Sequence, residues 1–244
     1  RAYLLKGEKL PPGEFGVMHG YMKIPELKKV CHAYGVSINE YLVAVYVWSV
    51  YTECMHGMPS ERPVRVAVPV NLRPYFNSIT TKNFFVMVSA EFHPTKEIYT
   101  FEEVLKSVSE SLRSQISREN LEKLFSYNVS NEKLLAARIV PLFLKNLAMR
   151  YVYTTSALAN TATVTNIGNI SVSEEYRPYV EMFHAFLAMS KGQHLKGTIC
   201  SYGDTLVFSF SYDLADTSVQ RGFFRKIAAD GIAVEIETNG VNYE

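Results

Sequence analysis

The sequence predicts an α/β fold of the two-layer α+β kind, in which helices cover a mixed β-sheet mainly on one face. The chain has 244 residues, of which 48% are apolar, and this is enough to bury a sizeable core. Helical and strand-like segments follow one another in the order helix, helix, strand, strand, helices, several strands and a closing helix. The order contains few strand–helix–strand alternations, which favours a mixed sheet.

The first part of the chain is predicted to be a linker. The stretch from Ala2 to Gly20 contains Pro11, Pro12 and nearby glycines, which are typical of turns and loops. Residues 1–22 are therefore assigned to a linker, and residues 23–244 to a single domain. The chain starts with Arg1 and shows no targeting signal, which suggests a piece of a longer protein.

Two helices are expected next. One begins near Pro25, which suits the first helical position, and ends at Gly35, which suits a left-handed C-terminal cap. Ser37 and Glu40 then form a capping box. Residues 41–48 are apolar on every side, so the second helix is expected to be fully buried.

Strands are expected where β-branched and aromatic residues gather. These segments span residues 64–70, 84–92, 161–167, 179–189, 195–202 and 205–212. Gly203 and Asp204 predict a tight hairpin between the last two.

The remaining segments are helical. Thr100 and Glu103 form a second capping box, which opens an amphipathic helix that runs towards Arg118. Residues 132–150 predict more helix, with a break at Pro141. A closing helix runs to Gly231 and is capped by Asp216 or Thr217.

Composition argues against several classes of function. Lysine and arginine number 25 against 24 acidic residues, without charge blocks, so nucleic acid is not an expected partner. The three cysteines, Cys31, Cys54 and Cys200, have the spacing of neither a disulfide framework nor a zinc site, which favours a reducing, cytoplasmic location. The longest apolar runs fall short of the roughly 20 residues of a membrane span, so none is expected.

Histidines are the natural candidates for a general base. The six are His19, His32, His56, His93, His184 and His194. Each also fits an ordinary structural role, and the pairs at residues 31–32 and 54–56 supply only two candidate metal ligands each, so no metal site is predicted. His93 has Glu97 four residues later, although Pro94 makes a turn at a strand end the alternative explanation.

Several motifs together resemble one family. They lie at residues 35–42 (Gly-Val-Ser-Ile-Asn-Glu-Tyr-Leu), 68–76 (Val-Pro-Val-Asn-Leu-Arg-Pro-Tyr-Phe), 83–84 (Asn-Phe), 165–168 (Thr-Asn-Ile-Gly) and 206–213 (Leu-Val-Phe-Ser-Phe-Ser-Tyr-Asp). In this order they resemble condensation-domain and alcohol-acetyltransferase-like proteins of the chloramphenicol-acetyltransferase-like superfamily of CoA-dependent acyltransferases. The resemblance covers the chain from about Ala2 to Glu237 and is to the C-terminal lobe.

The resemblance implies a two-lobed enzyme with a channel between the lobes. In that superfamily the first lobe carries a His-x-x-x-Asp motif, whose histidine is the general base, and CoA or a pantetheine arm enters from the opposite side. This chain contains no His-x-x-x-Asp. It is therefore expected to be the non-catalytic lobe, with acyl-CoA or a phosphopantetheine thioester as co-substrate of the longer protein and no tightly bound cofactor.

A vestige of the catalytic motif is expected at Tyr212 and Asp216. They have the spacing and placement of the motif, with tyrosine in place of histidine. A tyrosine with a pKa of about 10 is a poor base at neutral pH. The alternative is that Asp216 only caps the closing helix.

The resemblance also implies a set of residues that line the substrate or cofactor channel. They are Asn71, Arg73, Asn83, Thr165 and Asn166. Arg73 would contact substrate or carrier phosphates, or alternatively form an ion pair that orders the channel. The others would bind pantetheine amides or the acceptor, or alternatively satisfy backbone groups at strand ends.

The expected partners are the missing N-terminal lobe, a small acyl donor and an alcohol or amine acceptor, and a carrier protein. The longer protein is expected to be an O- or N-acyltransferase, and this chain alone to be inactive. A silent carrier-docking or scaffold module, or half of a nonribosomal peptide synthetase condensation domain, are the alternatives. The face that packs on the missing lobe should be apolar, and the chain could dimerise through it.

Overall fold

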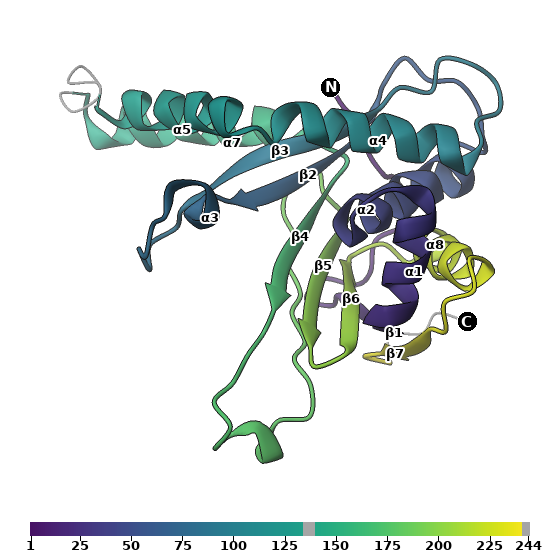
Figure 1. Ribbon diagram of the computed structural model, residues 1–244. Coiled ribbons are helices and arrows are strands. Elements are labelled where there is room, and N and C mark those ends of the chain that lie inside the picture. The colour runs from purple at the N-terminus through teal and green to yellow at the C-terminus, as the bar shows by residue number, and fades with distance from the viewer. Residues whose placement is uncertain (134–139, 241–244) are drawn as a thin grey trace.

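The computed structural model describes residues 1–133 and 140–240, which form a mixed sheet with helices on one face (Figure 1). The seven strands are ordered β3-β2-β4-β5-β6-β1-β7. Their bounds are β1 Gly16–Lys23, β2 Val64–Asn71, β3 Phe85–Phe92, β4 Ala162–Asn169, β5 Leu195–Tyr202, β6 Thr205–Tyr212 and β7 Glu235–Thr238. Strand β4 is parallel to β2 and β5, and the other neighbours are antiparallel. The predicted fold class is confirmed.

The helices form the second layer of the domain. They are α1 Ile24–Tyr34, α2 Ile38–Ser49, α3 Arg73–Phe76, α4 Phe101–Gln115, α5 Arg118–Lys133, α7 Leu142–Ala157 and α8 Ser218–Ala229. A π-helical turn, η1 Val50–Cys54, continues α2, and a 3₁₀ turn, η2 Arg177–Tyr179, lies between β4 and β5. Helix α2 packs between α4 and α8, over the same face of the sheet (Figure 1).

Helix α2 is the centre of the core. The capping box of Ser37 and Glu40 starts it, as predicted, and residues 41–47 are buried on all sides. Two tyrosines remain compatible with this burial because their hydroxyls have partners: Tyr41 Oη donates to Asp230 at 2.7 Å, and Tyr46 Oη donates to the Leu195 carbonyl at 3.0 Å. The sheet, α2 and α8 are thereby joined.

The linker predicted for the start of the chain is wrong from Gly16 onwards. Residues Gly16–Lys23 form β1, which lies between β6 and β7. The glycines there serve close packing: a Cβ at Gly16 would lie 2.1 Å from the Tyr212 ring, and one at Gly20 would lie 2.1 Å from the Phe224 ring. Glycines that indicate a loop in the sequence therefore make room for aromatic rings in a strand.

The segment predicted as a strand at residues 179–189 is not one. Side chains 183–188 alternate between half-buried and exposed, which is the pattern of a strand. The segment has no ladder partner, because it crosses the face of β5 and β6, both of whose edges are already paired. In contrast, the short edge strand β7 has no counterpart in the prediction, since all four of its residues are exposed.

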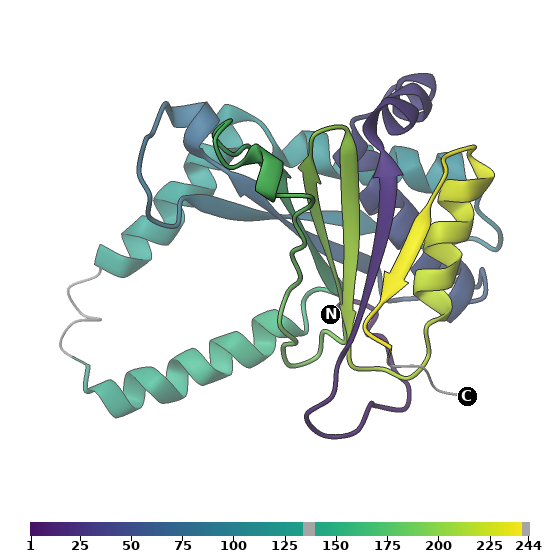
Figure 2. The same ribbon diagram turned by 90° about the horizontal axis from the view of Figure 1, so that it is seen from below.

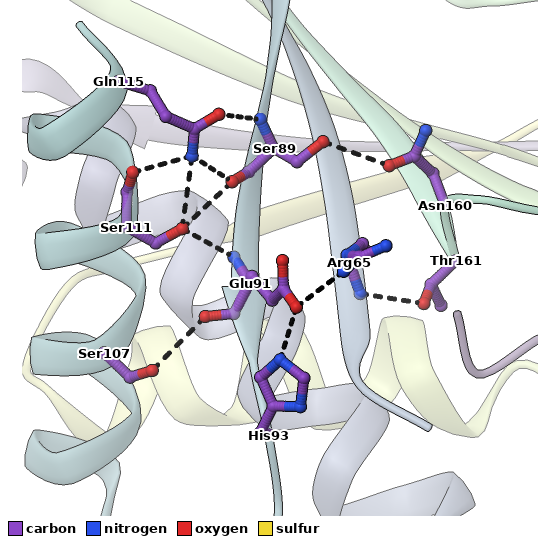
Figure 3. Close-up of polar contacts among 9 residues, drawn as sticks. All are labelled: Arg65, Ser89, Glu91, His93, Ser107, Ser111, Gln115, Asn160 and Thr161. Atoms are coloured by element: carbon purple, nitrogen blue, oxygen red, sulfur yellow. Dashed lines mark hydrogen bonds and ion pairs between the residues drawn. The ribbon is translucent and has the colours of Figure 1, made fainter. Parts of the chain in front are cut away.

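One edge of the sheet is closed by helix α4 (Figure 3). Three polar side chains four residues apart, Ser107, Ser111 and Gln115, face the free backbone of β3. Ser111 Oγ accepts from the Glu91 amide at 3.2 Å and donates to the Ser89 carbonyl at 3.0 Å. Gln115 accepts from the Ser89 amide at 3.1 Å and donates to its carbonyl at 2.8 Å. These side chains replace a neighbouring strand and block strand addition at this edge.

Helices α5 and α7 project away from the sheet (Figures 1 and 2). The predicted helix at residues 132–150 matches the end of α5 and the start of α7, whose N-cap is Pro141, while residues 134–139 lie outside the described part of the chain. Helix α7 is apolar and exposed, with Leu147 at 67% and Tyr151 at 74% exposure. Within the described residues, no helix has the length and apolar character needed to cross a bilayer.

Candidate functional site

Three of the five predicted channel residues, Asn71, Arg73 and Asn83, lie next to the ends of β2 and β3, and the other two, Thr165 and Asn166, lie in the middle of β4. Strands β2 and β4 run parallel, so both run towards the end of the sheet at which Asn71 lies. Asn83 precedes β3, which is antiparallel to β2, and therefore starts from the same end. The turn between β5 and β6 and the last residue of β1, Lys23, also lie there. Strands β2 and β4 pair only at residues 66–67 and 162–163 and then diverge (Figure 1), and of the five predicted residues Asn166 lines the groove described below.

The side chain of Arg73 forms hydrogen bonds with residues close to it in the sequence. Its guanidinium donates to the Thr80 carbonyl at 2.8 Å, to the Lys82 carbonyl at 2.7 Å and to Asn71 Oδ1 at 3.2 Å. These contacts tie down the loop between α3 and β3. Among the described residues, its partners are neutral oxygens and not the carboxylate of the expected ion pair. Asn83, two residues before this strand begins, is exposed.

An open groove of about 530 Å³ lies at this end of the sheet. The first turns of α1 and α2 form one side of it, and the end of β4 with the β5–β6 turn forms the other. The lining residues with polar side chains are Lys28, Asn166, Asn169, Ser201 and Asp204. A bulge separates Asn166 from Gly168: Asn166 Oδ1 accepts from the Gly168 amide at 2.8 Å, and Gly168 has a φ of 87°. Amide and hydroxyl groups in such a groove can bind the amides of an extended ligand.

Sequence reasoning found Asn166 but missed several of its neighbours in the groove. Asn169 and Ser201 lie close together, and Ser201 Oγ donates to Asn169 Oδ1 at 3.5 Å. Lys28 comes from α1, more than a hundred residues earlier in the chain. Only Asn39 carried a usable signal, because it stands in the motif at residues 35–42 and its Oδ1 lies 3.5 Å from Asn166 Nδ2.

The pair predicted as a vestige of a catalytic motif has a structural role. Tyr212 is 2% exposed, its ring lies over Gly16, and burial raises the pKa of its hydroxyl. Asp216 accepts from the Ser218 amide at 2.9 Å and from the Ser218 hydroxyl at 2.8 Å, at the start of α8. Tyr212 is therefore neither accessible nor basic at neutral pH.

A histidine–carboxylate pair lies next to this motif. His194 Nδ1 and Asp213 Oδ1 are 2.8 Å apart, at the point where β5 begins and β6 has just ended. The carboxylate can orient the imidazole. The adjoining cavity has only about 20 Å³, room for one water molecule and not for a substrate.

A second histidine–carboxylate pair lies at the edge strand β3 (Figure 3). His93 Nε2 contacts Glu91 and not Glu97, the partner suggested by spacing. Arg65 donates to Glu91 at 2.8 Å, and this bond, opposed by partial burial, lowers the pKa of the carboxyl. Residues 91 and 93 meet because alternate residues of an extended chain share a face.

His19 and His184 form the third group. Their ring centroids are 4.5 Å apart, and Tyr21 Oη lies 2.8 Å from His184 Nε2. Burial and the neighbouring His184 lower the pKa of His19, against a smaller opposing effect of Glu237. Within the described residues, no group of three or more histidine, cysteine, aspartate or glutamate side chains is arranged to hold a metal ion.

Solved structures share this fold. Nonribosomal peptide synthetase FmoA3 matches with a TM-score of 0.59 and 17% identity over 93% of this chain and 23% of its own. Trichothecene 15-O-acetyltransferase TRI3 from Fusarium sporotrichioides matches with a TM-score of 0.58 and 13% identity, over 93% and 48%. The epimerization domain from the third module of tyrocidine synthetase B gives 0.55 and 11%, over 93% and 49%.

These matches confirm the predicted resemblance at the level of the fold: the chain shares its fold with part of a peptide synthetase, of an epimerization domain and of an O-acetyltransferase. The chain spans about half of the acetyltransferase and of the epimerization domain, and a smaller share of the synthetase. No protein-family model and no curated protein sequence matches the chain.

Proposed function

We propose that the chain is the C-terminal, non-catalytic lobe of an acyltransferase that moves an acyl group from CoA or a carrier thioester to an alcohol or amine. One observation carries the proposal: nearly the whole chain superimposes on an O-acetyltransferase and on an epimerization domain, but it covers only about half of each. A second lobe of similar size is then the main partner. A fold alone does not determine which reaction a protein catalyses. The proposal therefore also depends on the residues at the end of the sheet.

The groove at the sheet end supports binding of the acceptor alcohol or amine. Its neutral polar groups, the amides of Asn166 and Asn169 and the hydroxyl of Ser201, can hydrogen-bond a polar acceptor, and the carboxylate of Asp204 in its lining is paired with Lys23. Lys28 and the N-terminal turns of α1 and α2 would attract an anionic group of such an acceptor. Arg73 has a positioning role in this proposal, since it holds the loop that borders the sheet end.

The proton transfer is assigned to the missing lobe. The chain has no His-x-x-x-Asp, and the tyrosine at the corresponding place is buried with a raised pKa. The acceptor hydroxyl or amine has to lose a proton as it attacks the thioester carbonyl, and a positioned base contributes about 10²–10⁴-fold to such a step. This lobe would then supply a wall of the channel and hold the donor.

Acyl transfer by the full-length gene product tests the proposal. We expect an upstream segment with His-x-x-x-Asp, and transfer from acetyl-CoA to some members of a panel of alcohols and amines. Replacement of the upstream histidine by alanine should reduce the rate by about 10²–10⁴-fold, and the 244-residue chain alone should be inactive. Thioester turnover by this chain alone would contradict the proposal. Carrier binding without any transfer by the full-length protein would instead favour the scaffold alternative.

We also propose a cytoplasmic location. Cys31, Cys54 and Cys200 are all free, and two of them are buried. Free cysteines are typical of reducing compartments. Fractionation of cells that produce the full-length protein would test this.

A further inference from the structure

A continuous row of polar side chains runs across the sheet on the face opposite the helices. Direct strand pairing places Thr165 of β4 beside Thr198 of β5, Thr198 beside Ser209 of β6, Ser209 beside His19 of β1, and His19 beside Glu237 of β7. We call these five residues the polar row. Paired residues share a face of the sheet, so the row is one surface built from five strands. It includes Thr165, which the sequence already marks as a channel residue.

The middle of the polar row is buried. Thr198 and Ser209 are each 1% exposed. Ser209 Oγ has a partner in His19 Nδ1 at 2.7 Å, whereas Thr198 Oγ1 has no hydrogen-bond partner among the described residues. A buried hydroxyl without a partner costs stability, and such groups are rare in folded proteins. A hydroxyl of this kind at the centre of a polar surface points to a ligand that is bound there.

A segment of this chain covers the middle of the polar row. We call residues 182–188 the strap (Figure 2). Side chains of β5 and β6 donate to its carbonyls: Lys196 Nζ to Ala188 at 2.8 Å, Ser211 Oγ to Leu187 at 2.6 Å, and Cys200 Sγ to Phe183 at 3.1 Å. The face therefore already binds an extended chain of amides, through donors that aim at carbonyl oxygens.

The strap is attached by single contacts. It belongs to no strand ladder, and side chains of the sheet hold it through hydrogen bonds and ring contacts. Near its start, His184 contacts Tyr21 and lies against His19, beside an open cavity of about 790 Å³ that also contains Glu237. The polar row thus continues from beneath the strap to an open cavity at β7, by which a ligand can enter.

We propose that the polar row is a binding track for the pantetheine arm of the acyl donor, and that the strap occupies this track when no donor is bound. The identity of the ligand rests on the proposed function. Pantetheine is an extended chain with two amides, and its carbonyls can accept from Lys196 and Ser211 in place of the strap carbonyls. Thr198 gains its missing partner from the ligand.

One substitution separates this role from a structural one. Thr198→Val keeps the shape of the side chain and removes the buried hydroxyl, so the free energy of unfolding should stay equal or rise. Pantetheine affinity, measured by calorimetry on the 244-residue chain, should fall by about 3- to 10-fold, the effect of one lost hydrogen bond. Ser109→Ala is the matched control, since Ser109 on α4 is another buried hydroxyl without a partner, far from the track. It should leave the affinity unchanged.

A second substitution tests the strap. Tyr21→Phe removes the hydroxyl that contacts His184 of the strap and donates to Glu237 of the polar row, and the loss of the His184 contact should speed hydrogen exchange at residues 182–188. Because the strap competes with the ligand, the same change should raise pantetheine affinity severalfold. Added pantetheine should speed exchange of the strap in the unmodified chain as well.

Two results would overturn the track: no pantetheine binding to either the unmodified chain or Tyr21→Phe, or equal affinities of Thr198→Val and Ser109→Ala. Acyl transfer by the full-length protein together with either result would show that only the track is wrong. Pantetheine binding that depends on Thr198, without acyl transfer by the full-length protein, would support the binding track but contradict the proposed acyl-transfer reaction.

Discussion

The two faces of strand β6 are equally buried but carry different kinds of side chain. Leu206, Phe208, Phe210 and Tyr212 point towards the helices and are buried in the aromatic core. Ser209 and Ser211 alternate with them, are equally buried, and lie beneath the strap. Burial of the first face on folding removes a large apolar surface from water. Burial of the second face replaces hydrogen bonds to water by hydrogen bonds within the protein. We infer that the helix side provides stability and the strap side is available for binding.

The largest expected difference between the faces comes from one aromatic residue. Phe210 packs against the rings of Tyr46, Phe208, Phe223 and Phe224, with centroids between 4.8 and 5.8 Å away. Phe210→Ala should reduce the free energy of unfolding by about 3–5 kcal/mol, because it leaves a cavity in this cluster. Urea unfolding measures this, with Ser209→Ala as the control on the other face. Equal losses for the two variants would contradict the comparison.

The ion pair of Glu40 and Arg113 sharpens the comparison through its pH dependence. Glu40 completes the capping box of α2 and binds Arg113 of α4. Burial raises the pKa of Glu40, but the bonds from Arg113 and Ser37 outweigh it and hold the pKa below its ordinary 4.5. The stabilisation is therefore complete above about pH 4.5 and is lost as the pH falls through the lower folded value.

Glu40→Gln should cost about 2 kcal/mol at pH 7. The difference from the unmodified chain should shrink as the pH falls below that range, which urea unfolding at several pH values would show. The exposed Glu110, 3.9 Å from Lys106, gives the control Glu110→Gln, expected within about 0.5 kcal/mol at all pH values. A difference for Glu40→Gln that grows in acid would contradict the assignment.

The edge of the sheet beside α4 should respond less. Ser111→Ala removes bonds to the backbone of Ser89 and Glu91, and should cost about 1 kcal/mol. The freed edge should also increase association of the chain, which light scattering measures. Ser114, whose hydroxyl bonds only within α4, gives the control Ser114→Ala. Association equal to the control would mean that the hydroxyl does not protect the edge.

The smallest effect on stability is expected at α7. Leu147 is exposed, so Leu147→Glu should change the free energy of unfolding by no more than about 0.5 kcal/mol. It should nevertheless weaken dimers formed through the apolar surface of this helix. Size-exclusion chromatography at several concentrations measures the dimers. If the unmodified chain is a monomer at every concentration, the expected dimer is contradicted.

Local rules predicted the elements that depend on neighbouring residues. The capping boxes of α2 and α4 and the β5–β6 hairpin appear where the sequence places them. The failures occur where distant residues decide. Gly16 and Gly20 belong to a strand because of rings from β6 and α8, and residues 183–188 alternate in burial because a sheet face lies beneath them.

The candidate site shows the same division. The sequence predicted Asn71, Asn83, Thr165 and Asn166 as channel residues, and the structure places Asn166 in the groove, Thr165 on the polar row, and Asn71 and Asn83 at or near the ends of β2 and β3. It did not reveal that Arg73 is committed to loop carbonyls, or that His93 has Glu91 as its partner. These hydrogen-bond partners depend on the three-dimensional positions of loops and strand ends. The spacing of residues along the sequence does not specify those positions.

The sequence by itself determined the two-layer α/β architecture, the buried character of α2 and the absence of a His-x-x-x-Asp motif. These follow from periodicity, caps and residue identity, which are local properties of the chain. Only the tertiary structure decided which polar residues share a face, because cross-strand register joins residues as far apart as His19 and Ser209. The polar row and the strap above it exist only when five strands have been aligned.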